Sequence, residues 1–238
     1  MSEDLPAPPA AFFAACEAHG PVLTPEQLEL LRRYLSRLLS VNRQLNLTAV
    51  RDADTAWMRH IFDSIQAGAC IKRDPGQSAL DLGSGGGLPG IPLAILFPEI
   101  QWTLVDSVGK KARFLAETAS ELGLGNVEVL CARAEELGRS PAARGQYHLV
   151  TARAVARLPV LLEYAVPLLR EKGVFYAMKG EKAMAELAES GRAVERLGVR
   201  LLRKTPTAAG GMLLVFKKHA PTPEKYPRPV GVPAKEPL

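Results

Sequence analysis

The chain of 238 residues has few cysteines, few aromatic residues and no long apolar run. Its three cysteines, Cys16, Cys70 and Cys131, lack the spacing of a disulfide framework or a zinc site. No apolar stretch approaches the roughly 18 residues of a membrane span, and the opening MSEDLPAPPA lacks the pattern of a secretion signal. We therefore expect a cytoplasmic protein that binds no metal and does not enter a membrane.

The composition is that of a globular protein, with 47% hydrophobic and 23% charged residues. The formal net charge of +5 only favours an anionic partner, but the distribution of charge is more informative. Five arginines and no acidic residue lie between Leu31 and Arg51; they are Arg32, Arg33, Arg37, Arg43 and Arg51. This stretch predicts a basic patch, although a solvated helix face explains some of these arginines equally well.

Helical patterns fill the first 70 or so residues. Thr24 and Gln27 have the spacing of a capping box, and Pro25 suits the first helical position. Leucines then recur at helical spacing, and a second helix is expected from about 54 to 69. We interpret residues 1–72 as an amino-terminal helical extension.

From Ser78 onward, short apolar segments alternate with helical ones. This alternation predicts an α/β fold with right-handed crossovers and a mainly parallel, doubly wound sheet. The expected strands are 78–82, 101–106, 126–131, 147–152, 173–178, 199–203 and 211–218, and the main expected helices are 109–122, 157–170 and 181–197. The last two strands are expected to form an antiparallel hairpin, and a Pro-rich tail follows at 219–238 after a domain at 73–218.

The segment ALDLGSGGGLPG, residues 79–90, is a glycine-rich turn behind an expected strand. In one register it matches the GxGxxG pattern of dinucleotide enzymes, beginning at Gly85. In another it places Asp81 two residues ahead of Gly83, Gly85 and Gly87. A carboxylate at that strand end would repel a pyrophosphate but attract the cationic S-adenosylmethionine. The alternative is that Asp81 only caps the next helix or binds loop amides.

Asp106 ends the second expected strand, where this fold places a carboxylate beside ribose hydroxyls. Ser107 and Val108 follow, and a short apolar side chain there suits one face of an adenine. The alternative reading of Asp106 is an N-cap for the helix that begins near Gly109.

Three further positions lie behind later strands. After the third strand, Ala134 and Glu135 suit a backbone and a side-chain contact to adenine, or a solvated turn. Arg153 ends the fourth strand where the methyl group would be delivered, and it suits a cofactor carboxylate, an RNA phosphate or a surface salt bridge. Lys179 ends the fifth strand on the same edge.

The segments LDLGSGGGLPGIPLAI, LVDSVGKKARFL, TARAVA and MKG resemble the bacterial glucose-inhibited division protein B family, which are methyltransferases of guanine N7 in small-subunit ribosomal RNA. The stretch NLTAVRDADTAWMRHIFDSI and the tail KYPRPVGVPAKEPL extend the resemblance over nearly the whole chain. It implies a class I S-adenosylmethionine-dependent methyltransferase fold, Rossmann-like with a mainly parallel seven-stranded sheet. It also implies that 16S ribosomal RNA or the small ribosomal subunit is the partner.

The resemblance and the loop pattern together define the expected sites. Cofactor contacts are expected from Asp81, Gly83, Gly85, Leu88, Asp106, Ser107, Val108, Ala134, Glu135 and Arg153. RNA contacts are expected from Arg32, Arg33, Arg37, Arg43, Arg59, His60, Lys179 and Arg228, although a tail that packs along the domain and a His60 hydrogen-bonded to Asp63 are the simpler alternatives. N7 of guanine carries a lone pair and no proton, so no general base is expected. Arg153 and Lys179 are the candidates near the methyl-transfer position, and a monomer suffices.

Three other functions stay open from the residues alone. A small-molecule methyltransferase would ignore ribosomal particles, and a non-catalytic RNA-binding factor would not bind the cofactor. A nicotinamide dehydrogenase is disfavoured by Asp81. Cofactor binding followed by methyl transfer to RNA, particles and nucleosides separates these possibilities.

Overall fold

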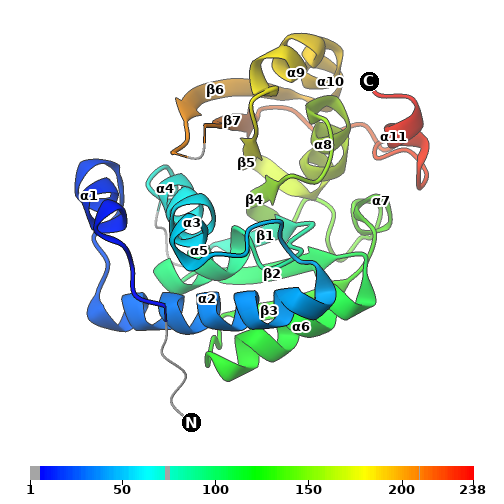
Figure 1. Cartoon of the computed structure of the whole chain (residues 1–238). Helices are drawn as coiled ribbons and strands as arrows, with labels where there is room; N and C mark the ends of the chain where they lie inside the picture. Colours follow the sequence, from blue (N-terminus) through cyan, green and yellow to red (C-terminus); the bar gives the residue numbers. More distant parts are fainter. Residues whose placement is uncertain (1–5, 73–75, 209) are drawn as a thin grey trace.

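The computed structural model describes residues 6–72, 76–208 and 210–238, and every structural statement below concerns these residues. Seven strands form one sheet in the order β3-β2-β1-β4-β5-β7-β6 (Figure 1). The strands are β1 (Ser78–Leu82), β2 (Gln101–Asp106), β3 (Val127–Cys131), β4 (Tyr147–Arg153), β5 (Leu169–Lys179), β6 (Val199–Pro206) and β7 (Met212–Lys218).

Strands β1 to β5 run parallel, whereas β7 is antiparallel to both β5 and β6. The expected α/β sheet and its terminal antiparallel hairpin are therefore confirmed. From β1 the chain turns first toward β2 and β3 and later returns on the other side as β4. A ligand crevice opens at such a reversal, outside the carboxyl ends of the strands.

Two apolar cores cover the two faces of the sheet. Side chains such as Trp102, Leu104 and Tyr176 point into one core, together with the helices of the extension, α5 and α6. Neighbouring side chains such as Val105 and Phe175 point into the other, together with α8 and α10. The covering helices are α1 (Ala10–His19), α2 (Pro25–Leu45), α3 (Ala53–Ala56), α4 (Asp63–Gly68), α5 (Gly90–Leu96), α6 (Gly109–Glu121), α7 (Ala134–Leu137), α8 (Leu158–Ala165), α9 (Ala183–Glu189), α10 (Gly191–Leu197) and α11 (Val232–Lys235).

The helical extension packs directly onto the glycine loop. Helix α2 begins with the expected capping box of Thr24 and Gln27. Further along α2, the Tyr34 hydroxyl donates to the Gly86 carbonyl at 2.7 Å. A Cβ on Gly86 would lie only 2.9 Å from the Leu38 side chain, so glycine permits this close approach. The extension thus shares its core with the sheet.

Three expected helices differ from the observed ones. The helix expected over 157–170 ends at Ala165 and passes through a short 3-10 turn (η2, Val166–Leu168) into β5, because Pro167 cannot continue it. The helix expected over 181–197 is broken into α9 and α10 at Ser190. The helix expected over 54–69 is present, but a π-helical segment (η1, Trp57–Phe62) forms its middle.

The Pro-rich tail packs against α7 and α8. The Arg228 guanidinium pairs with Glu163 at 2.7 Å, and Glu163 is fully buried. Because a buried carboxylate needs a countercharge, Arg228 anchors the tail there. The structure thus shows the packed tail that was the alternative, and an RNA contact of Arg228 stays a prediction.

Candidate active site

The glycines of the loop are required for two reasons, backbone conformation and close packing. Gly83 and Gly85 adopt positive φ angles of 68° and 57°, a region that favours glycine. Gly87 likewise has a positive φ, of 94°. A Cβ on Gly83, Gly86, Gly87 or Gly90 would collide with a neighbouring side chain, and on Gly90 it would lie 2.4 Å from Leu104. Close packing therefore accounts for these four glycines, whereas a Cβ on Gly85 would meet nothing closer than the Gly83 carbonyl oxygen at 3.8 Å.

Asp81 faces inward, away from the crevice. Its carboxylate is 0% exposed and accepts from the Thr151 hydroxyl at 2.8 Å and from the Gly90 N–H at 3.1 Å. Burial raises the pKa of Asp81 to about 6. The expected contact to a cationic ligand is therefore corrected, because Asp81 holds the start of α5 on the sheet.

Asp106 lies one strand away and opens onto a cavity. Its two carboxylate oxygens accept from the Gly85 N–H and the Val108 N–H, each at 2.9 Å. These two amides fix the orientation of the side chain, and each oxygen keeps a second lone pair. Asp106 is thus positioned to accept hydrogen bonds from a ligand diol while it holds the loop.

The first cavity has a volume of about 150 Å³ and lies over the ends of β1, β2 and β3. It brings together five of the expected cofactor residues, which are Gly83, Asp106, Ser107, Ala134 and Glu135. Glu135 also accepts from the Gly231 N–H at 3.0 Å, so it ties the tail to this wall. The sequence reasoning missed Val155 and Tyr164, which line the cavity from after β4 and from α8. Val155 belongs to the quoted TARAVA segment, but Tyr164 carried no sequence signal.

A second cavity, of about 240 Å³, lies on the other side of the segment that follows β4. Arg153 and Lys179 both line it, as expected of the ends of β4 and β5. Ala154, with a φ of 55°, lines this cavity, whereas the next residue, Val155, lines the first. Two neighbouring cavities therefore lie at the carboxyl edge of the sheet, one on each side of the backbone at Ala154 and Val155.

Arg153 is held by the π-helical segment. Its Nη2 donates to the Arg59 carbonyl at 2.7 Å and lies 3.2 Å from His60 Nδ1, and its Nη1 lies 3.8 Å from Asp63. Since a guanidinium only donates, His60 Nδ1 accepts, and its Nε2 carries the proton toward the Thr48 hydroxyl at 2.5 Å. Burial and the neighbouring Arg153 lower the pKa of His60 to about 4. His60 is thus a neutral holder of Arg153 rather than a partner of Asp63.

Lys179 is also engaged by protein. Its ammonium donates to the Ala156 carbonyl at 2.6 Å and pairs with Glu186 at 2.8 Å. These contacts fix the segment after β4 that separates the two cavities. Three further expected cofactor residues do not line the first cavity: Gly85 and Leu88 belong to the glycine loop, and Val108 follows β2.

The arginines of the basic stretch divide into two groups. Arg37 bridges α2 to α6 through Glu117, Glu121 and the Thr118 hydroxyl, and Arg33 donates to the Glu121 carbonyl. Arg32 pairs with Glu29 one turn away. Each of these three has a protein partner, and their contact with RNA stays a prediction.

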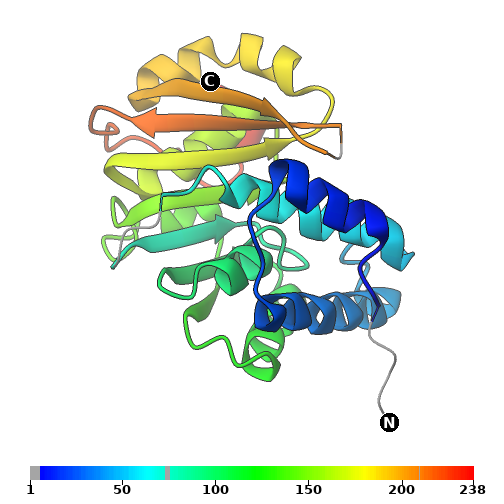
Figure 2. The same ribbon diagram turned by 90° about the vertical axis from the view of Figure 1, so that its left-hand side faces the viewer.

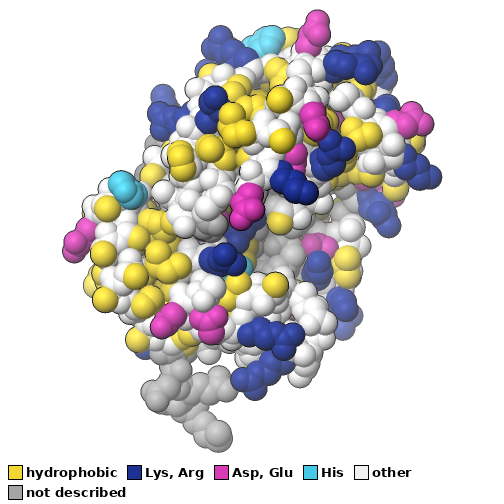
Figure 3. Space-filling model, turned by 45° about the horizontal axis from the view of Figure 1, so that its top comes forward, with side chains coloured by type: hydrophobic (Ala, Val, Ile, Leu, Met, Phe, Trp, Pro, Cys, Tyr) yellow, Lys and Arg dark blue, Asp and Glu magenta, His cyan; other side chains and the backbone are white. Residues whose placement is uncertain are grey.

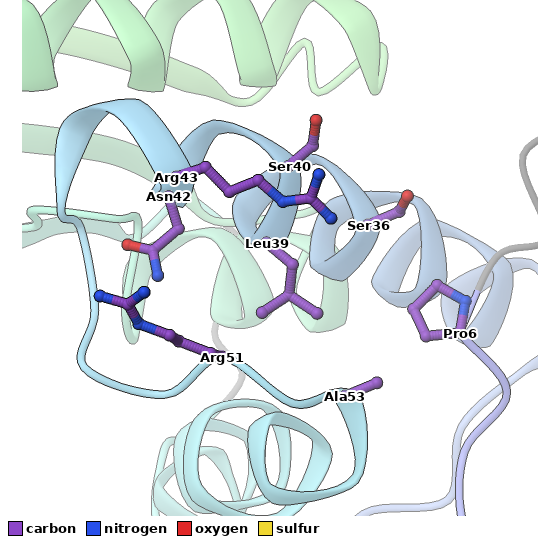
Figure 4. Close-up of a pocket in the computed structure, with 8 residues that line it drawn as sticks. All are labelled: Pro6, Ser36, Leu39, Ser40, Asn42, Arg43, Arg51 and Ala53. Carbon is purple, nitrogen blue, oxygen red and sulfur yellow. The ribbon is translucent and has the colours of Figure 1, made fainter.

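Arg43 and Arg51 form the second group. Both are exposed, and they lie along a hollow of about 680 Å³ between α2 and α3 (Figure 4). Arg59 is exposed as well, and within the described ranges none of these three guanidiniums has an ion-pair partner. On the face seen in Figure 3, Lys and Arg side chains are spread out with Asp and Glu between them.

The residues of the first cavity suit S-adenosylmethionine. The Asp106 carboxylate matches the ribose diol, and the side chains of Leu82, Val105 and Val155 offer apolar walls for an adenine. A Cβ at Gly83 would lie 2.6 Å from the Val155 side chain, so only glycine fits between the loop and that wall.

None of the helices in the described ranges is long and apolar enough to cross a membrane. The same ranges contain no cluster of three or more His, Cys, Asp or Glu side chains that could hold a metal ion.

Comparison with known proteins agrees with this geometry. A SAM-dependent methyltransferase from Aquifex aeolicus superposes with a TM-score of 0.54 at 17% identity, covering 77% of this chain and 97% of that chain. A ribosomal protein L11 methylase from Lactobacillus delbrueckii gives a TM-score of 0.54 at 16% identity, covering 66% and 77%. At such identities these structures support the fold alone.

Sequence relatives are much closer. Ribosomal RNA small subunit methyltransferase G of Roseiflexus sp. is 45% identical, covering 93% of this chain and 96% of that protein. The protein of the same name from Deinococcus radiodurans is 43% identical, covering 91% and 94%. The family model GidB, described as rRNA small subunit methyltransferase G, matches residues 27–210. The chain therefore belongs to the rRNA small subunit methyltransferase G family and is an S-adenosylmethionine-dependent rRNA methyltransferase.

Proposed function

We propose that the chain transfers a methyl group from S-adenosylmethionine to N7 of a guanine in 16S ribosomal RNA. The observation that carries this proposal is the meeting of two cavities at one sheet edge, in a member of this family. The first would hold the adenosine part of the cofactor against Asp106, Gly83 and Ala134. The second would receive the guanine beside Arg153. Small ribosomal subunits are assembled in the cytoplasm, which is where we propose that the chain acts, as a monomer.

The groups that surround the second cavity fit an attack that needs no base. S-adenosylmethionine, when bound, supplies an electrophilic methyl on a sulfonium. Guanine N7 attacks with an in-plane lone pair and has no proton to lose. His60 is neutral with both ring nitrogens engaged, and the Lys179 ammonium is already paired with Glu186. The task of these residues is therefore to hold the two reactants in line and exclude water.

Arg153 would orient a ligand without touching the reacting atom. A bidentate contact of an arginine with guanine O6 and N7 would block the atom to be methylated. We propose instead that Arg153 binds the cofactor carboxylate or an RNA phosphate. Its guanidinium is well placed for this, because it lines the second cavity and contacts with Arg59, His60 and Asp63 fix its orientation.

Methyl transfer to matched substrates tests the proposal. Labelled S-adenosylmethionine is incubated with the chain and naked 16S RNA, assembled small subunits or free nucleosides, and modified RNA is then cleaved at N7-methylguanine with borohydride and aniline. We expect label in RNA or particles and one specific cleavage. Label in free nucleosides alone would support the small-molecule enzyme, and cofactor binding without transfer to any RNA would refute the proposal.

A further inference from the structure

A second basic region lies on the sheet itself, away from the arginines of α2. A groove of about 400 Å³ crosses β4, β5, β7 and β6 on the face that also carries the helical extension. Figure 2 looks onto this side of the molecule. Helices α1 and α4 lie at the right of the view, and no helix crosses in front of β5, β7 and β6 at its left.

Cations from four separate segments of the chain converge on this groove. Its lining contains five Lys and Arg side chains and no Asp or Glu; the five are Lys72, Arg170, Lys172, Arg203 and Lys217. Within the part of the chain that the structure describes, none of the five has an ion pair with a carboxylate. Such a cluster of like charges costs folding energy through repulsion, and a bound polyanion would relieve that repulsion.

The floor of the groove is firmly built. Leu149, Val174 and Val215 form an apolar base. The Tyr176 hydroxyl donates to the Cys70 carbonyl at 3.1 Å, and Arg203 reaches the Cys70 sulfur at 3.6 Å, which ties the segment after α4 to the sheet. The charged rim therefore stands on a fixed surface.

The groove is aligned with the proposed methyl-transfer position. Val174 and Tyr176 line the groove, and Met178, two residues further along the same side of β5, lines the cavity that contains Arg153. Val174 and Met178 are four residues apart, about 13 Å along a strand, which corresponds to about four nucleotides of a stacked strand. Tyr176 and Met178 are themselves buried under the extension, so an RNA strand that contacts both places crosses the outer surface between them.

We infer that this groove binds the phosphate backbone of the RNA next to the guanine that is methylated. The inference rests on the proposed function, since it names a second surface for the same substrate. Phosphate contacts of this kind position an RNA and carry no sequence information. The groove thus supplies affinity, and the cavity beside Arg153 selects the base.

Paired charge removal tests the groove. In the groove variant, Arg170→Gln is combined with Lys217→Gln. In the matched control, Arg192→Gln is combined with Arg196→Gln, which removes two exposed charges from α10 on the opposite face of the sheet. Binding to naked 16S RNA is measured over a series of salt concentrations, and melting curves establish that each variant is folded.

We expect the groove variant to bind naked RNA about 10-fold more weakly at 0.1 M salt, with a salt slope reduced by about 1.5. Its affinity for S-adenosylmethionine and its kcat should stay unchanged while KM for RNA rises, and the control should bind RNA within about 2-fold of the unsubstituted chain. Equal behaviour of groove and control variants would overturn the inference. So would a loss confined to assembled subunits, which would indicate a protein contact, or an unsubstituted chain that binds naked RNA without salt dependence. Failure of the unsubstituted chain to methylate any RNA is a separate readout and concerns the proposed function.

Discussion

The carboxyl edge of the sheet and the helical extension each contain two residues of the same type, one held by protein contacts and one accessible to a ligand. At the edge, Asp81 is sealed inside while Asp106 opens onto a cavity. In the extension, Arg37 is bound to α6 while Arg43 is exposed beside a hollow. In both regions the residue type was informative, but only one member of each pair is available to a ligand.

The two regions differ in the strength of the interactions that fix these side chains. Both aspartates accept hydrogen bonds from backbone amides at the edge of the sheet, where water is scarce. Arg37 makes its ion pairs at the surface, where such pairs contribute little to stability, and Arg43 makes none among the residues that the structure describes. Substitutions at the edge should therefore have larger effects than those in the extension.

The largest effect is expected at Asp106. Asp106→Ala removes the acceptor for a ribose diol and releases the Gly85 and Val108 amides, so we expect affinity for S-adenosylmethionine to fall about 100-fold, about 3 kcal/mol. Titration calorimetry measures this. Asp106→Asn keeps one acceptor oxygen, so its affinity for S-adenosylmethionine should fall less than that of the alanine variant. Unchanged affinity in the alanine variant would remove Asp106 from the cofactor site.

Asp81 should affect stability with a defined pH dependence. Burial raises the pKa of the Asp81 carboxyl from its ordinary value of 3.8 to about 6, so the folded state binds more protons than the unfolded state. This contribution to stability is present below pH 3.8 and is lost as the pH rises through 6. Asp81→Asn lacks this titration. Between pH 4 and pH 7, its stability relative to the natural chain should therefore improve by about 2 to 3 kcal/mol. Urea unfolding at both pH values gives the difference, and a constant difference would contradict the buried titration.

Arg153 joins the two regions and should show an intermediate effect. Arg153→Ala removes the positive charge beside His60, so the pKa of His60 should rise from about 4. We also expect kcat/KM for methyl transfer to fall about 10-fold, about 1.4 kcal/mol. NMR titration of the imidazole and initial rates provide the two measurements. An unaltered pKa of His60 would show that the two side chains do not interact in solution.

The smallest effects are expected on α2. Arg37→Ala should destabilise the fold by about 1 kcal/mol, because it unties α2 from α6, with little change in RNA affinity. Arg43→Ala should leave stability within about 0.5 kcal/mol and weaken RNA binding about 3- to 5-fold. Denaturation and salt-dependent RNA binding are measured on both variants. If the Arg37 and Arg43 variants change stability and RNA affinity by the same amounts, the division of the basic stretch into two groups is wrong.

Much of the fold and part of the site followed from local pattern. The alternation of strands and helices predicted the sheet, and Gly83, Asp106 and Ala134 were expected at the cavity that they line. Such positions are predictable because a parallel sheet places the ends of its strands at one edge. Tyr164 could not be predicted in this way, because it lines the cavity from helix α8, and the apolar sequence of that helix does not indicate which residue faces the cavity.

The sequence by itself determined where strands end, where glycine is required and where positive charge is concentrated, because these depend on neighbours along the chain. Only the tertiary structure decided which way each polar group faces. Asp81 faces inward, where its carboxylate accepts hydrogen bonds from Thr151 and Gly90. Arg37 and Arg228 form ion pairs with carboxylates on other helices. The groove on β5, β7 and β6 is likewise a product of folding, since its cations come from four segments of the chain that become neighbours only when the strands pair.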